Sequence, residues 1–146
     1  MRYLGLDVGD VRIGVALSDE TATLASGLLT LERVGPRKDV RALAALVRER
    51  DVGEVVVGMP YLLDGSLGPQ GEKVTAFVEA LRRALEVPVV TWDERLTSVA
   101  ADELLAEAGV RRRDRKDRID RAAAVLILQG YIDARPSRVG PGEEGP

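Results

Sequence analysis

Two short apolar runs at the start of the chain lie so close together that only a tight turn can separate them. The first is Tyr3-Leu4-Gly5-Leu6, the second spans 13–17, and Asp7 ends the first run. Runs of this length and composition predict two β-strands, at 2–8 and 11–18, joined by a short turn. Burial of a carboxylate away from water costs much free energy unless the carboxylate is paired or binds a metal. Asp7 is therefore either the cap of its own turn or part of a functional site.

The rest of the chain alternates strand and helix patterns. A third β-favourable stretch completes an antiparallel meander of three strands, and two short apolar runs are typical of parallel strands. The sequence therefore predicts an α/β domain, a mixed five-stranded sheet with helices on both faces. The remaining expected elements are a strand within 21–32, a helix near 38–50, a strand at 54–58, a helix around 74–85, a strand at 88–92, a helix around 101–108 and a last helix from about 118 to 133. We expect 122–128 of that last helix to be buried nearly all round, because this stretch is apolar.

Length and composition indicate one globular domain. Of the 146 residues, 45% are hydrophobic, which is enough for a proper core. We expect this domain to span 1–135, and the tail from 136 to 146, rich in Pro, Gly and charge, to be disordered. No apolar run approaches the roughly 20 residues of a membrane span, and Met1-Arg2-Tyr3 has no signal-peptide pattern. A cytoplasmic protein without a membrane segment is the expectation.

Two absent residue types restrict the chemistry. Without cysteine there is neither a disulfide framework nor a thiolate metal site. Without histidine, Ser-His-Asp and Cys-His catalysis and histidine zinc sites are excluded. Any catalysis must use carboxylates, hydroxyls, Lys, Arg or a bound metal. The net charge of −3 gives no global basic field that would attract nucleic acid.

Acidic residues stand at the ends of three predicted elements. Asp7 ends the first strand, Asp93-Glu94 follows the last strand, and Asp120 begins the last helix on the face it shares with Ala124 and Ile127. Each acid alone has a structural explanation, as a turn cap, a helix-terminus charge or an ion-pair partner. Sites in α/β sheets form beyond the carboxyl ends of the strands. Together the acids favour a carboxylate cage for two Mg²⁺ or Mn²⁺ ions, which prefer oxygen ligands.

At these residues the chain resembles a known family, the Holliday junction resolvase-like proteins that are also described as pre-16S rRNA nucleases. The resemblance covers about residues 2 to 133, with four motifs in the same order. The motifs are Asp7-Val8-Gly9 with Arg12-Ile13-Gly14-Val15-Ala16, Gly58-Met59-Pro60 with Asp64-Gly65, Asp93-Glu94-Arg95-Leu96-Thr97-Ser98, and the stretch from Asp120 to Leu128.

The resemblance implies a ribonuclease H-like fold and a metal-dependent nuclease that cuts phosphodiesters. It links the chain to maturation of the 5′ end of the small-subunit ribosomal RNA precursor, with structured RNA as the preferred substrate and branched DNA as the next. Asp7, Glu94 and Asp120 match the family's acidic triad, as catalytic residues and metal ligands. Strand alternation also places Glu94 in phase with Trp92, and Asp93 on the opposite face. Trp92 itself is expected in the core.

Five basic residues are the candidates for substrate binding. They are Arg12, Arg95, Arg112, Arg113 and Lys116. The last three belong to a dense basic segment, 111–118, which we expect to be a loop before the last helix. It either holds nucleic-acid phosphates without sequence specificity or is a solvated charged loop.

Some positions depart from the family pattern or have open roles. Asp10 and Val11 stand where the family usually has a small or hydroxyl residue followed by a basic one, so the first turn is a weak candidate for phosphate binding. Asp117 is either a helix N-cap, which we favour, or a fourth metal ligand. Thr97 or Ser98 is expected to cap the helix that follows.

Two other function classes are compatible with parts of the sequence. A nucleic-acid-binding ribosome-assembly factor would keep the fold without catalysis. A sugar-kinase or actin-like phosphotransferase module also carries an acid and glycines before a hairpin, but the chain has one such unit and no second phosphate loop. The oligomeric state stays open between a monomer, which suits RNA trimming, and a homodimer, which suits a two-fold junction.

Overall fold

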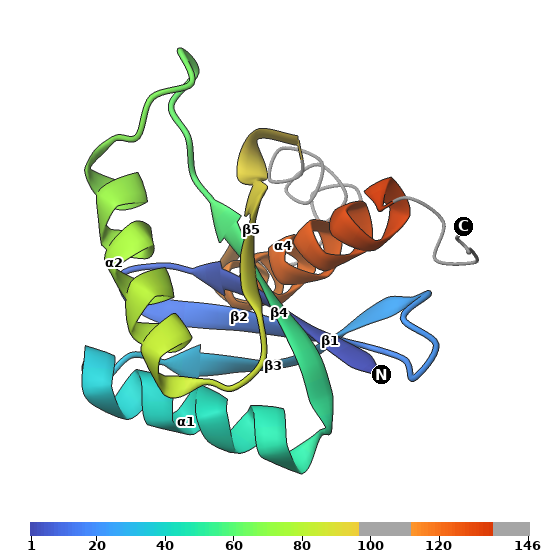
Figure 1. The fold of residues 1–146 in the computed structure, drawn as a ribbon. Helices are drawn as coiled ribbons and strands as arrows, with labels where there is room; N and C mark the ends of the chain where they lie inside the picture. The colour runs from blue at the N-terminus through green and yellow to red at the C-terminus, as the bar shows by residue number, and fades with distance from the viewer. Residues whose placement is uncertain (97–111, 136–146) are drawn as a thin grey trace.

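A mixed five-stranded sheet with the strand order β3-β2-β1-β4-β5 forms the centre of the molecule (Figure 1). The computed structural model describes residues 1–96 and 112–135. Of residue 96 and residues 112–120 it describes the backbone and not the side chains. The strands are β1 (Arg2–Val8), β2 (Arg12–Ser18), β3 (Ala25–Glu32), β4 (Val52–Met59) and β5 (Val89–Asp93). The predicted α/β class and the ribonuclease H-like sheet are confirmed.

The antiparallel half of the sheet forms as the apolar runs predict. β1 and β2 are joined by a tight turn, in which the Gly9 amide donates to the Arg12 carbonyl oxygen at 2.8 Å. The register pairs Asp7 with Gly14 and Leu6 with Val15. β2 in turn pairs with β3, which completes the expected meander.

The parallel half consists of β4 beside β1 and β5 beside β4. Both strands are short and apolar, and Val55, Val56 and Val57 are fully buried because helices cover both faces of the sheet. β5 ends at Asp93, and a 3₁₀ turn, η1 (Glu94–Leu96), follows it directly.

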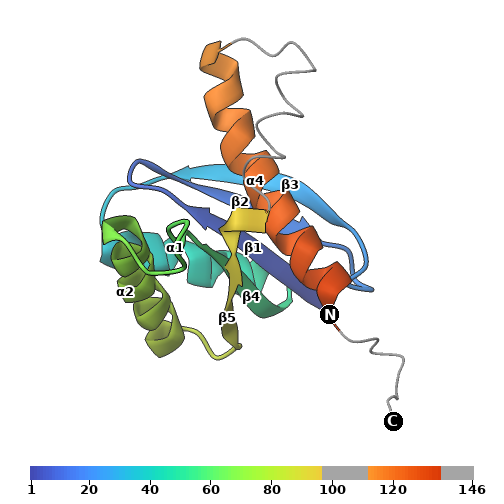
Figure 2. The same cartoon turned by 90° about the horizontal axis from the view of Figure 1, so that it is seen from above.

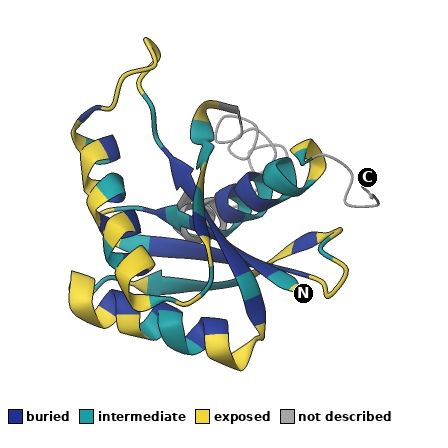
Figure 3. Cartoon of the chain, in the orientation of Figure 1, coloured by how far each residue is buried: buried dark blue, intermediate teal, exposed yellow. Residues whose placement is uncertain are grey.

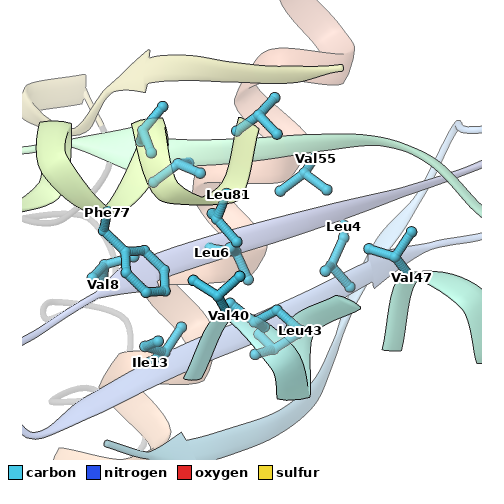
Figure 4. Close-up of a cluster of buried hydrophobic side chains, with 14 of the residues drawn as sticks. Leu4, Leu6, Val8, Ile13, Val40, Leu43, Val47, Val55, Phe77 and Leu81 are labelled. Atoms are coloured by element: carbon cyan, nitrogen blue, oxygen red, sulfur yellow. The ribbon is translucent and has the colours of Figure 1, made fainter. Parts of the chain in front are cut away.

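Two helices cover one face of the sheet. α1 (Pro36–Glu49) and α2 (Pro69–Ala84) pack their apolar stripes on β1, β2 and β4. Figure 4 shows Val40 and Leu43 of α1, and Phe77 and Leu81 of α2, pointing into the side chains of these strands. Their outer faces are exposed (Figure 3), as amphipathic helices require.

α4 (Arg112–Ala134) covers the opposite face, as the view from above makes clear (Figure 2). It begins at Arg112, so the expectation of a loop through the basic segment and of a helix start near 118 is wrong. Asp117 therefore lies inside the helix and is no N-cap, and Asp120 lies in its third turn, not its first. A run of charged residues can extend a helix whose later turns are held by tertiary packing.

The middle of α4 is less uniformly buried than its composition predicted. Ala123, Ala124, Ile127 and Leu128 are buried against the sheet, whereas Ala122, Val125 and Leu126 are partly exposed. Among the described residues, the sheet covers only one side of this helix, so the side chains on its other side keep part of their exposure. The helix expected at 101–108, its caps at Thr97 or Ser98, and the tail at 136–146 lie outside the described residues.

The carboxyl-terminal end of α4 is tied to the start of the sheet by polar contacts. The Tyr131 hydroxyl donates to Glu54 Oε2 at 2.5 Å, and Arg135 Nη1 donates to Glu54 Oε1 at 3.1 Å and to the Tyr3 hydroxyl. Burial, with Glu54 adding to it, raises the pKa of Tyr131 to about 12 and keeps this donor protonated. Trp92 packs edge-on against Tyr131, at 6.2 Å between ring centroids, and is a half-buried residue at the edge of the core, where the sequence predicted a core position.

A second polar tie holds the β1–β2 turn on the other face. Arg33 donates from Nη1 to the Gly9 carbonyl oxygen at 2.8 Å and from Nε to Asp39 Oδ2 at 2.9 Å. Asp39 also accepts the Val34 amide and is 1% exposed. Burial alone would raise the pKa of Asp39, but these hydrogen bonds outweigh it, and the pKa of Asp39 is lowered. None of the helices in the described part of the chain combines the length and apolar character needed to cross a membrane.

Asp39→Asn should lower the free energy of unfolding by roughly 1–3 kcal/mol at pH 7, because Arg33 loses a buried charged partner. The folded pKa of Asp39 lies below its ordinary value of 3.8. The charge therefore stabilises the fold above that value, and its contribution is lost as the pH falls through the lowered pKa. Urea denaturation at pH 7 and at pH 3 measures both effects.

The matched control is Glu79→Gln, which removes a carboxylate from an exposed pair with Arg82 on α2. We expect this variant to unfold like the unmodified protein, since exposed pairs contribute little. An Asp39→Asn destabilisation that is equally large at both pH values would contradict the assignment to charge.

Candidate active site at the carboxyl ends of the strands

Asp7 lies on the face of the sheet that α4 covers. It is in phase along β1 with Tyr3 and Gly5, and a methyl group added to Gly5 would lie 2.7 Å from Leu128 Cβ. Its partner in β2 is Gly14, and its neighbour in β4 is Gly58, one residue beyond the Leu6–Val57 pair. Both flanking positions are glycines, so the floor beside the Asp7 carboxylate carries no side chain from β2 or β4 at these positions.

Glu94 reaches the same face from the end of β5. A methyl group added to Gly58 would lie 2.7 Å from Glu94 Cγ, 2.9 Å from Glu94 Oε2 and 2.5 Å from Ile127 Cδ1. The Glu94 side chain therefore extends over Gly58, between β4 and α4. The predicted phase of Glu94 is confirmed, and Asp7, Gly58 and Glu94 follow one another across three adjacent strands.

The charges around Glu94 are arranged so that its ionised form is disfavoured. Burial, and then the neighbouring charge of Asp93, raise the pKa of Glu94 to about 7. Asp93 itself is held ionised: Arg95 Nη2 lies 2.6 Å from Asp93 Oδ2, and the hydrogen bond from Arg95 lowers the pKa of Asp93. A cation bound beside Glu94 would offset both the burial and the repulsion.

The backbone course of α4 brings the position of Asp120 to this same end of the sheet. α4 runs antiparallel to β1, because Arg135 contacts Tyr3 while Leu128 and Ala124 lie over Gly5. Asp120 precedes Ala124 by one helical turn, about 6 Å, and Asp7 follows Gly5 by two strand residues, about 7 Å. Measured from the contact of Ala124 with Gly5, Asp120 and Asp7 are therefore displaced by matching distances in the same direction. Asp120, the third acid of the predicted set, thus comes from the helix layer, whereas Asp7 and Glu94 come from the sheet.

These residues fit a divalent metal. Carboxylate oxygens are the ligands that Mg²⁺ and Mn²⁺ prefer, and Gly58 leaves the space that the Glu94 carboxylate occupies beside β4. Among the side chains that the structure describes, no three His, Cys, Asp or Glu groups gather with metal-site geometry. Asp120 is outside that set, so Asp7 and Glu94 are the two described acids of the site.

The predicted substrate-binding residues fall into three groups. Arg12 begins β2 and is in phase with Gly14, so it lies on the face and at the end of the sheet that carry Asp7. Arg95 is engaged with Asp93 and also donates from Nη1 to the Leu62 carbonyl oxygen at 3.4 Å. Arg112, Arg113 and Lys116 belong to the first two turns of α4, and their side chains are not among those described.

Sequence reasoning quoted Gly14 and Gly58 only as parts of motifs and gave them no role. Their role as the floor of the site depends on strand pairing, but glycine inside an apolar strand was a usable signal of close approach. Arg33, whose guanidinium holds the Gly9 carbonyl beside Asp7, was also missed. No local pattern distinguishes it from the other arginines.

A cavity of about 550 Å³ lies on the opposite face of the sheet, between α1 and α2. It is lined by Val8, Arg33, Lys73 and Phe77, among others. The sheet separates it from the acids, because Val8 points away from the face that carries Asp7. The cavity is therefore distinct from the carboxylate site.

Solved structures share this fold at low sequence identity. "T. thermophilus RuvC in complex with Holliday junction substrate" aligns with a TM-score of 0.58 and 13% identity, covering 91% of this chain and 94% of that one. The Holliday junction resolvase of fowlpox virus aligns with a TM-score of 0.57 and 12% identity, covering 92% of this chain and 100% of that one.

Sequence comparison reaches much closer relatives. A protein of Thermoanaerobacter pseudethanolicus called "Putative pre-16S rRNA nuclease" is 48% identical over 139 residues, which is 94% of this chain and 100% of the relative. A protein of the same name from Clostridioides difficile is 50% identical over 132 residues, covering 90% of this chain and 94% of the relative. The family model described as "RuvX: Holliday junction resolvase" matches residues 1–134. The chain therefore belongs to the RuvX family.

Proposed function

We propose that this protein is a metal-dependent nuclease that hydrolyses phosphodiester bonds during processing of the 5′ end of the 16S rRNA precursor. The observation that carries the proposal is the sequence of Asp7 in β1, Gly58 in β4 and Glu94 directly after β5, with the position of Asp120 in the layer above. The names of the relatives from Thermoanaerobacter pseudethanolicus and Clostridioides difficile support RNA as the substrate.

In this proposal each residue has a distinct task. Asp7, Glu94 and Asp120 would hold Mg²⁺ or Mn²⁺, two ions in all. Such ions, when bound, activate water and neutralise charge on a phosphate. Gly58 would keep Glu94 in place, because a side chain at position 58 would meet Glu94 at less than 3 Å. Arg12, Arg95 and the basic turns at the start of α4 would hold flanking phosphates.

A second candidate substrate is branched DNA. The description of the family model and the fold shared with RuvC favour it. The same carboxylates would then cut a Holliday junction, and a homodimer would be expected for a two-fold symmetric substrate. A non-catalytic assembly factor is the remaining alternative, and it differs from both nucleases in not needing Asp7 for its activity.

Asp7→Asn should reduce cleavage by at least about a hundredfold, because it removes a metal-binding charge and leaves the fold almost unchanged in shape. The measurement is cleavage of a precursor RNA and of a four-way DNA junction, with Mn²⁺ or with EDTA. The substrate cut faster by the unmodified protein decides between the two candidates. If the unmodified protein cleaves neither substrate and Asp7→Asn still binds nucleic acid, the assembly factor is favoured.

Gly58→Ala should lower cleavage by roughly a hundredfold, because displacing a catalytic group by about 1 Å has an effect of that size. The new methyl group would meet Glu94 and Ile127 at less than normal contact distance. Gly27→Ala is the matched control, since its methyl group would lie 3.6 Å from Arg121 Cβ on the same face of the sheet. Equal activity of the two variants would contradict the role of Gly58.

Replacing Arg112 and Arg113 with Glu should weaken nucleic-acid binding and reduce the slope of log affinity against log salt. Each lost phosphate contact removes about 0.7–0.9 from that slope. The control pair is Arg37→Glu with Arg41→Glu, which makes the same charge change on α1, across the sheet from the acids. Unchanged affinity and slope for the α4 variant would rule out phosphate binding there.

A further inference from the structure

The loop that joins β4 to α2, residues 60–68, has a defined hairpin shape. Tyr61 and Leu67 form an antiparallel bridge, and the Leu62 amide donates to the Ser66 carbonyl oxygen at 2.9 Å. The Gly65 amide closes the turn on the Leu62 carbonyl oxygen at 2.8 Å, with Gly65 at a φ of 88°. The backbone at the tip of this hairpin is therefore held in a defined conformation before any partner binds.

The acid at the tip is turned back into the loop. Asp64 Oδ1 accepts the Ser66 amide at 2.9 Å and the Ser66 hydroxyl at 2.7 Å. These bonds lower the pKa of Asp64, and the positive charge of Arg95 acts on it in the same direction. The carboxylate thus stabilises the turn, and its charge is partly compensated.

Three leucines of the loop differ in how they are covered. Leu62 is 48% exposed and rests on Gly68, and Leu67 is 40% exposed and rests on Gly71, because methyl groups on these glycines would meet the leucines at about 3 Å. Leu63, at the tip, is 97% exposed. Among the described residues it is the most exposed of the large hydrophobic side chains.

The hairpin is attached to the candidate active site through Arg95. This residue follows Glu94 directly, donates to the Leu62 carbonyl oxygen, and has its guanidinium 5.5 Å from the centroid of the Tyr61 ring. Figure 1 shows the loop projecting beyond the sheet at the end where β5 finishes. The tip therefore lies at the same end of the sheet as the carboxylates.

We infer that Leu63 is a wedge that inserts between two bases of a structured RNA beside the bond to be cut. The inference rests on the proposed function, because it takes the carboxylates as the place where RNA binds. A leucine on a rigid tip can enter a base step that is already weakened by a bulge or a junction, and unstacking there costs least. Base faces, unlike phosphates, are apolar and accept such a side chain.

A protein partner fits the tip less well. Stable protein interfaces bury about 800 Å² on each side, and one leucine with two half-covered neighbours provides far less. The tip is also next to the charged groups of the site, where a nucleic acid is the expected occupant. Self-association through the tip is the alternative, and a change in sedimentation of a tip variant would reveal it.

The test compares Leu63→Ser with Leu24→Ser, a variant of another exposed leucine, 66% exposed, in the β2–β3 connection. The probe is an RNA hairpin with an internal bulge and 2-aminopurine beside the bulge, bound in EDTA so that it is not cut. For Leu63→Ser we expect roughly tenfold weaker binding and loss of the fluorescence rise that unstacking causes, with an unchanged salt slope. Leu24→Ser should bind like the unmodified protein.

Equal binding and an equal fluorescence rise in both variants would overturn the wedge. So would a change in sedimentation of Leu63→Ser alone, which would identify the tip as a self-association contact. Because binding is measured without metal, the result is independent of cleavage. If Leu63→Ser loses the fluorescence rise but the unmodified protein does not cleave RNA, the nuclease proposal alone is contradicted. If the unmodified protein cleaves RNA but Leu63→Ser keeps the fluorescence rise, the wedge alone is contradicted.

Discussion

The close approach of α4 to β1 is the contact on which the arrangement of the acids depends. Gly5 permits it, because any side chain there would collide with Leu128 Cβ and the Ala124 carbonyl oxygen. The helix runs antiparallel to the strand at this distance, so one helical turn and two strand residues cover nearly the same length. Asp120 and Asp7 therefore reach the same end of the molecule from two layers.

Polar ties on the two faces hold this arrangement at its ends. On the α4 face, Glu54 accepts hydrogen bonds from Tyr131 and Arg135, which keeps the helix from sliding along the sheet. On the other face, Arg33 links the Gly9 carbonyl oxygen to Asp39. Each buried acid has its donors, so the fold tolerates these charges without losing specificity.

Glu94 differs from those acids, because burial and the charge of Asp93 raise its pKa. Arg95 neutralises Asp93 and extends toward the 60–68 loop, so the positive charge nearest to Glu94 in sequence is already committed. A cation bound beside Glu94 would favour the ionised form of this carboxylate, and carboxylates with perturbed pKa values are typical of functional sites.

Local sequence patterns were sufficient to predict which segments are strands and which are helices. The spacing of apolar residues shows directly which face of an element is buried, as in 2–8, 36–49 and 52–59. They also identified Asp7 and the Asp93-Glu94 pair as candidates through their places at strand ends, whereas the place predicted for Asp120 at the start of the last helix was wrong. They failed at the start of α4, where charged residues carry no periodic signal and tertiary packing extends the helix to Arg112. The sequence by itself determined the chemistry that the chain has available. Only the tertiary structure decided which groups meet, since the glycine floor beside Asp7 exists only once β2 and β4 pair with β1.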